Sequence, residues 1–173
     1  MIYDYIIDTV LKIQSETLST SLIDICKFYN IYIHYHDLGY ELKGYYICYK
    51  NISNIVINQN LREEFINLVL GHELGHHFLH NLDNLDYTFF QDSLLFSGTQ
   101  VETEANLFSA ELLLPDTETL LTLFSTDNIY EAASFSNVPA WFMNYKIQLL
   151  RHKGFKIPYT YIPGNLSDNT AAY

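Results

Sequence analysis

LREEFINLVLGHELGHHFLH, residues 61–80, is the stretch that decides how this chain is built. It contains no proline, and its apolar residues recur at helical spacing, which predicts one continuous helix. Phe65 and Val69 form one apolar stripe of that helix, and Leu70 and Leu74 lie on the opposite side. Because both sides are apolar, the rest of the chain is expected to pack against this helix from two directions.

The segments around this helix predict an α+β fold. Runs rich in β-branched and aromatic residues, separated by Gly, Asn and Ser, predict strands at 31–35, 44–49 and 54–57. Apolar residues at helical spacing predict helices at 5–14, 20–29, 99–115, 116–124, 129–135 and 139–152. We therefore expect a small sheet of about three strands packed on the central helix, with additional, mostly C-terminal helices.

Length and composition favour one folded domain. A chain of 173 residues that is 49% hydrophobic can bury one ordinary core but is short for two. No repeat, low-complexity tract or linker divides it, so residues 1–173 are expected to form a single domain. Residues 81–98 are predicted to form a long connection, and long connections in compact domains often line functional sites. The polar tail from about 163 is expected to be flexible.

Charge and cysteine content limit the partners and the compartment. A net charge of −11 opposes attraction to DNA, RNA or anionic lipid, so a protein partner fits better and nucleic-acid binding is not expected. The sequence begins without a basic segment followed by a purely apolar stretch and contains no long apolar run, so neither export nor a membrane span is expected. Cys26 and Cys48 lie far apart without a CxxC spacing, so no disulfide framework is expected and a reducing cytoplasm is the natural location.

The histidines of the central helix indicate a metal site. His72 and His76 are four residues apart, so their imidazoles leave consecutive turns of one face, at the separation that a tetrahedral zinc ion requires. Glu73 leans toward the same side, where a general base would contact a metal-activated water. The alternative is a surface helix with incidental histidines. Such a helix would show a polar stripe, whereas this one is apolar on both sides of its histidine row.

A third zinc ligand has to come from another segment. Glu102 and Asn106 are four residues apart on the next predicted helix, so one could bind the metal and the other could hydrogen-bond a ligating imidazole. Glu104 points the opposite way. The alternative for Glu102 is a capping box with Thr99, in which the Glu side chain bonds the backbone of the cap residue.

Small residues on the two helices support a shared site. Gly75 lies on the first helix, and Ala105 and Ser109 lie on the second. They would let the two backbones approach closely, which a metal held between the helices demands. Ordinary helix packing also explains such residues, and it does not exclude the metal.

These motifs resemble the ImmA/IrrE family of metallo-endopeptidases, over roughly residues 54–115. The resemblance is carried by HELGH at 72–76 and by a following pattern made of Glu102, Ala105, Asn106, Phe108, Ala110, Leu112, Leu113 and Pro115. It implies a zincin-like peptidase of the gluzincin type that holds one zinc ion. The implied ligands are His72, His76 and Glu102, with Glu73 as the catalytic residue and Asn106 as a hydrogen-bond partner of a ligand. Gly71 stands where the family more often has Ala, a change expected to alter packing little.

The resemblance also implies a reaction and a substrate. Metal-assisted hydrolysis would use Glu73 to move a proton from water to the leaving amine, without a covalent intermediate. The substrate class would be a helix-turn-helix repressor of a prophage or mobile element. Candidates for stabilising the oxyanion are His77, His80 and Tyr87. An extended substrate was expected to pair with the predicted strand at 54–57.

Two other classes of function have some support in the sequence. Residues 129–150 outline a helix-turn-helix, with Lys146, Arg151, Lys153 and Lys156 as local positive charge, although a helical hairpin is the commoner explanation. Alternatively, the metal is structural, or the protein is a metal-containing regulatory binder that acts on a repressor or DNA without proteolysis. Glu73 argues against this reading, because a structural site needs no base beside an open coordination position.

Overall fold

The computed structural model describes residues 2–80, 87–92 and 99–157. The chain divides into two compact units, an N-terminal unit of residues 1–113 and a C-terminal unit of residues 114–173. The sequence-based expectation that residues 1–173 form a single peptidase domain stays a prediction. The tail from 163, expected to be flexible, lies outside the described residues.

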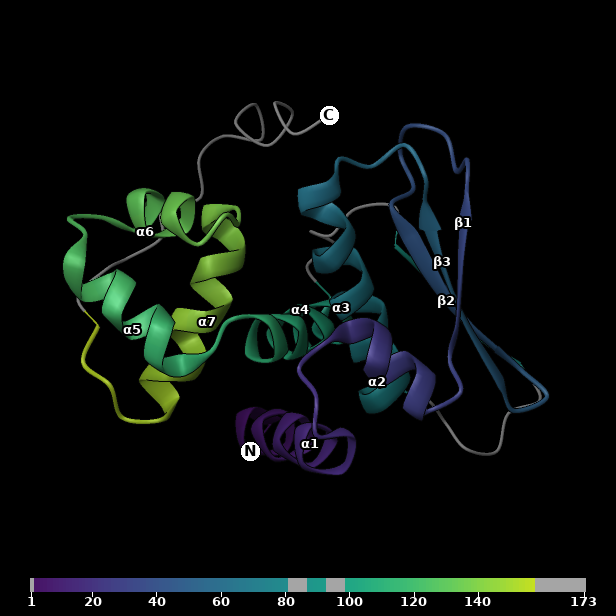
Figure 1. Cartoon of the computed structure of the whole chain (residues 1–173), viewed down its shortest axis with the longest axis horizontal. Coiled ribbons are helices and arrows are strands. Elements are labelled where there is room, and N and C mark those ends of the chain that lie inside the picture. The colour runs from purple at the N-terminus through teal and green to yellow at the C-terminus, as the bar shows by residue number, and fades with distance from the viewer. Residues whose placement is uncertain (1, 81–86, 93–98, 158–173) are drawn as a thin grey trace. The chain divides into compact units, whose positions relative to one another are not determined.

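The N-terminal unit is α+β, as the sequence predicts (Figure 1). Its elements, in chain order, are α1 (Ile2–Thr17), α2 (Leu22–Phe28), β1 (Tyr32–His36), β2 (Gly44–Tyr49), β3 (Ile52–Asn58), α3 (Glu63–His80), β4 (Tyr87–Asp92) and α4 (Gln100–Leu113). The three expected strands and the central helix are present. The element missing from the prediction is β4, which lies within the segment interpreted as a connection.

The four strands form one sheet in the order β1-β3-β2-β4. Strand β1 runs parallel to β3, whereas β2 is antiparallel to both β3 and β4. A two-residue turn joins β2 to β3, and its residues Lys50 and Asn51 have φ of 49° and 62°, as a type I′ hairpin requires. Because β3 is paired on both sides, the expectation that a substrate pairs with residues 54–57 is wrong. An added strand would have to pair with β1 or β4, the two outer strands of the described sheet.

Helix α3 lies between the sheet and α4 (Figure 1). It contacts β2 and β3 on one side and α4 on the other, and every residue from Leu68 to His76 is buried. Helix α4 also packs against α1, and every residue from Glu104 to Leu112 is buried. The two apolar stripes of α3 thus have the two packing partners that the sequence demands, and the histidine row lies inside the unit.

Helices α3 and α4 approach so closely that two positions on α3 have little room for a side chain. A Cβ on Gly75 would lie 2.8 Å from Ala105 Cα and 2.9 Å from Ala105 O, which are backbone atoms. A Cβ on Gly71 would meet Ser109 Oγ at 2.5 Å. The expectation that Gly71 in place of Ala alters packing little is therefore wrong, because in this chain Ser109 occupies the space that a methyl group would fill.

The C-terminal unit contains α5 (Asp116–Ser125), α6 (Ile129–Phe135) and α7 (Ala140–His152). Lys146 is fully buried, and its Nζ lies 2.6 Å from Asp116 Oδ1. Lys153 bonds the same carboxylate, and the Arg151 guanidinium donates to the Ile157 carbonyl. These basic side chains bind partners within the unit, which weakens the reading of this segment as a DNA-binding surface. Among the described residues of either unit, no helix is long and apolar enough to cross a membrane.

Candidate metal centre

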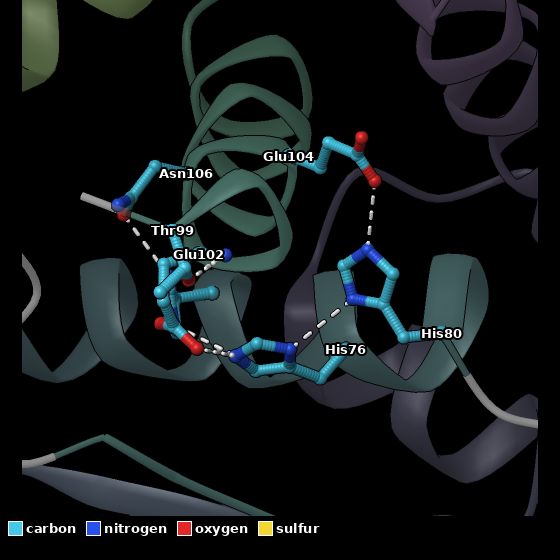
Figure 2. A network of polar contacts seen from close by, with 7 residues as sticks. His76, His80, Thr99, Glu102, Glu104 and Asn106 are labelled. Atoms are coloured by element: carbon cyan, nitrogen blue, oxygen red, sulfur yellow. Dashed lines mark hydrogen bonds and ion pairs between the residues drawn. The ribbon is translucent and has the colours of Figure 1, made fainter. Parts of the chain in front are cut away.

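Three side chains from two helices converge inside the N-terminal unit. His72 and His76 extend from α3, and Glu102 extends from the first turn of α4. Figure 2 shows the Glu102 carboxylate pointing toward the His76 ring. His72 Nε2 lies 3.0 Å from His76 Nε2 and 3.1 Å from Glu102 Oε2, and His76 Nε2 lies 3.5 Å from Glu102 Oε1. Within the described parts of the chain, they are the one group of three or more His, Cys, Asp or Glu side chains whose ligand atoms converge in this way.

Burial and the mutual contacts of the three side chains together determine the charge of this cluster. His72 is completely buried and His76 is 1% exposed. Burial lowers the pKa of His76 to about 4, although the neighbouring Glu102 carboxylate opposes the shift. Burial alone would raise the pKa of Glu102, but the neighbouring His72 and His76 rings outweigh it and lower the pKa to about 2. At neutral pH, therefore, an uncharged His76 imidazole faces a Glu102 carboxylate.

The donor set fits a divalent metal ion. Two imidazole nitrogens that face each other without a shared hydrogen repel through their lone pairs, and a cation between them removes that repulsion. Zinc–nitrogen bonds of about 2.0–2.1 Å in a tetrahedral site place two nitrogens roughly 3.3 Å apart. The 3.0 Å between His72 Nε2 and His76 Nε2 is close to that separation. Two imidazoles and one carboxylate also leave a fourth position open, as in catalytic metal sites.

Asn106 fixes the orientation of the His72 ring. Asn106 Oδ1 lies 3.0 Å from His72 Nδ1, and both residues are buried. An amide oxygen only accepts hydrogen bonds, so His72 carries its hydrogen on Nδ1 and directs the lone pair of Nε2 toward the cluster. Glu102 thus contacts His72 at Nε2, inside the cluster, whereas Asn106 contacts the same ring at Nδ1, on its other side.

The capping-box explanation for Glu102 holds only in part. Thr99 Oγ1 accepts a hydrogen bond from the Glu102 backbone N–H at 3.3 Å, as the cap residue of α4 should. The Glu102 carboxylate, however, points to His72 and His76 rather than back to the cap. Thr99 therefore stabilises the helix start while the Glu102 side chain reaches the metal site (Figure 2).

Glu73 is fully buried on the side of α3 that faces the sheet. A Cβ on Gly44, at the start of β2, would lie 2.6 Å from Val69 Cγ1 and 3.2 Å from Glu73 Oε1. The missing side chain at Gly44 thus makes room for the carboxylate beside the strand. The sequence predicted Gly44 only as the first residue of the strand at 44–49, because its proximity to Glu73 depends on how α3 packs on the sheet.

The three candidates for stabilising an oxyanion differ in their surroundings. His77 Nδ1 lies 3.1 Å from Tyr46 Oη and 3.3 Å from Ser53 Oγ, so its ring is bonded to the sheet. His80 lies beside His76 and bonds Glu104. The side chain of Tyr87 falls outside what the structure describes. The sequence named His80 as a candidate but gave no indication that Glu104, on another helix, would contact it.

The α+β fold and the converging His72, His76 and Glu102 side chains fit a metallopeptidase. A model of a peptidase family, described as the IrrE N-terminal-like domain, matches residues 26–148. The chain therefore belongs to the ImmA/IrrE family, which confirms the resemblance seen in its motifs.

Two relatives support this membership. The chain is 38% identical to uncharacterized immunity region protein 2 of Bacillus phage phi105 over 120 residues, which cover 68% of this chain and 73% of the relative. It is 33% identical to metallopeptidase ImmA of Bacillus subtilis (strain 168) over 136 residues, covering 75% and 76% of the two chains. No solved structure matches the chain significantly.

Proposed function

We propose that this chain is a zinc-dependent endopeptidase of the zincin-like, gluzincin type. The observation that carries the proposal is the convergence of His72, His76 and Glu102 from two helices, with Glu73 next to the first ligand in the sequence. Two histidines and a carboxylate are a donor set typical of catalytic zinc in peptidases. A base beside such a site has a use in hydrolysis and none in a purely structural metal site.

A bound zinc ion would supply Lewis-acid chemistry, which polarises a peptide carbonyl and acidifies water. Glu73 would accept a proton from the attacking water as the new carbon–oxygen bond forms. The same carboxylate would return that proton to the amine nitrogen as the carbon–nitrogen bond breaks. Burial of Glu73 keeps competing solvent away from this transfer and leaves its carboxylate beside Gly44.

For the substrate we propose a helix-turn-helix repressor of a prophage or mobile element, cleaved in the cytoplasm. Support comes from membership of the ImmA/IrrE family and from a phage relative whose name places it in an immunity region. The strongly negative chain, with a net charge of −11, also fits a protein substrate better than a nucleic acid. Cleavage of such a repressor would release the genes that it silences.

Glu73→Gln tests catalysis separately from metal binding. The amide preserves the size of the side chain but cannot accept the proton, so zinc content should be unchanged while cleavage falls by at least about 100-fold. The measurement is gel analysis of a purified helix-turn-helix repressor encoded beside the enzyme, together with elemental analysis for zinc. Glu64→Gln is the control, because Glu64 lies on the same helix at its exposed start. Full activity of Glu73→Gln would favour a nonproteolytic regulator.

A further inference from the structure

A chain of hydrogen bonds leads away from His76, on the side opposite the proposed metal. His76 Nδ1 lies 3.2 Å from His80 Nδ1, and His80 Nε2 lies 3.0 Å from Glu104 Oε2. Gln100 Nε2 donates to the other oxygen of Glu104 at 2.7 Å. Figure 2 shows His80 reaching from the end of α3 to Glu104, which lies on the opposite flank of α4 from Glu102 and Asn106.

The atoms in this chain specify where each hydrogen lies. The Glu104 carboxylate accepts hydrogen bonds, so the bond to His80 places the hydrogen on His80 Nε2. A His80 ring whose single hydrogen lies on Nε2 then has an acceptor at Nδ1. The contact between the two Nδ1 atoms needs one donor, which must be His76. With its hydrogen on Nδ1, His76 presents the lone pair of Nε2 to the metal site.

The two ligating histidines are thus held in the same tautomer by different means. For His72 a single acceptor, Asn106 Oδ1, is sufficient. For His76 the acceptor is the His80 imidazole, whose Nδ1 could also carry a hydrogen and donate it. A second group therefore has to fix which nitrogen of His80 carries the hydrogen. Glu104 does so, and the 12% exposure of both the His80 and Glu104 side chains leaves little competition from water.

We propose that His80 and Glu104 are positioning residues that fix the tautomer and ring orientation of His76 and so raise the affinity of the site for its metal. This inference rests on the proposed metal site and assigns neither residue a contact with the metal. A purely structural role is the alternative, in which the His80–Glu104 pair only fastens the end of α3 to α4.

His80→Asn separates the two explanations. Asn Oδ1 and His Nδ1 occupy equivalent places, each bonded to Cγ, and the amide oxygen is always an acceptor. His80→Asn therefore keeps an acceptor for His76 but removes the group that Glu104 bonds. If Glu104 acts through the tautomer of His80, its removal should matter only when position 80 is a histidine. If Glu104 is a structural fastener, losing the His80–Glu104 pair should harm the site in His80→Asn as well.

The experiment measures zinc affinity by chelator competition in wild type, Glu104→Ala, His80→Ala, His80→Asn and the double variant His80→Asn/Glu104→Ala. Glu104→Ala and His80→Ala should each weaken zinc binding roughly 10- to 100-fold, the usual effect of losing a partner behind a metal ligand. His80→Asn should stay within about threefold of wild type, and adding Glu104→Ala to it should change nothing further. The visible absorption of the cobalt-loaded proteins should change in the two weakened variants and match wild type in His80→Asn.

The proposal would be overturned if Glu104→Ala bound zinc as tightly as wild type. It would also be overturned if removing Glu104 reduced zinc affinity as much in the His80→Asn protein as in wild type. Melting temperatures of the metal-free variants show whether any of them has lost its fold. Stoichiometric zinc in wild type with no effect of Glu104 contradicts only the positioning role. Absence of zinc from wild type contradicts the proposed peptidase itself, so the two failures are distinguishable.

Discussion

At the scale of single residues, the site depends on which nitrogen of each imidazole carries the hydrogen. His72 and His76 can bind a metal through Nε2 only if Nδ1 holds the hydrogen, and each has a bonding partner at Nδ1. Such partners behind the ligands commonly determine metal affinity as strongly as ligand geometry does. The residues behind the ligands should therefore be almost as sensitive to substitution as the ligands themselves.

Asn106 offers a direct test of this sensitivity. Asn106→Leu removes the acceptor behind His72 and should weaken zinc binding roughly 10- to 100-fold. Asn106→Asp keeps an acceptor oxygen in the same place and should bind zinc nearly as well as wild type. Titration of the metal-free proteins with zinc against a competing chelator provides both values. Equal losses in the two variants would show that the hydrogen bond to His72 is not the cause.

Spacing in the sequence was enough to propose His72, Glu73 and His76 as site residues, because all three lie on one helix, where periodicity fixes which side chains share a face. Glu102 and Asn106 followed from the same rule on a second helix, but their separate roles did not. Gly44 and Glu104 were missed as site residues, because their contacts depend on how β2 and α4 are placed around α3. No local pattern encodes such placement.

At the scale of elements, the close approach of α3 and α4 brings Glu102 to the histidines. Gly75 faces Ala105 and Gly71 faces Ser109 along this contact. The sequence indicated these small residues as a tight interface, and the structure confirms the approach. Helices and strands with strong periodicity were predicted within a few residues. The pairing of β3 on both edges and the presence of β4 were not, because strand partners come from distant segments of the chain.

Gly75→Ala should damage this interface more than Gly71→Ala. The added Cβ at Gly75 meets the backbone of Ala105, which cannot rotate away, so the helices must separate. We expect a loss of about 1–3 kcal/mol from overpacking, more than the gain of about 1 kcal/mol in helix propensity, and weaker zinc binding as Glu102 recedes. At Gly71 the obstacle is the Ser109 side chain, so Ser109→Ala should relieve the clash. Urea unfolding of the metal-free proteins measures these effects.

At the scale of the whole molecule, the chain consists of two compact units, and only the N-terminal one holds the proposed site. The C-terminal unit has its own buried ionic contact, in which Asp116 joins Lys146 and Lys153. In the sequence these lysines suggest a possible DNA-binding surface. Their pairing with Asp116 is not visible there, because Asp116 lies at the start of α5 and the lysines lie at α7 and just beyond it.

Asp116→Asn should destabilise the C-terminal unit. It removes the carboxylate from the fully buried Lys146, and we expect a loss of roughly 2–3 kcal/mol at neutral pH, below the value for a fully buried pair because Asp116 is partly exposed. Fluorescence of Trp141, the single tryptophan, reports unfolding from α7 in the same unit. Asp127→Asn, at an exposed position of this unit, should cost little.

The same pair predicts how that stability depends on pH. Burial alone would raise the pKa of Asp116, but hydrogen bonds from Lys146 and Lys153 outweigh it and hold the pKa below its usual 3.8. The contribution is therefore complete above about pH 3.8 and disappears as the pH falls through the lowered pKa. The difference between wild type and Asp116→Asn should shrink over that range. A difference that stays constant with pH would contradict the ionic origin.

Zinc content is the most direct test of the central claim, that His72, His76 and Glu102 hold a catalytic metal. Untagged wild type, Glu102→Ala and the exposed control Glu118→Ala would be equilibrated at one free zinc concentration and submitted to elemental analysis. The account predicts about one zinc per chain in wild type and Glu118→Ala, and almost none in Glu102→Ala. A wild type without zinc, or full zinc content in Glu102→Ala, would contradict it.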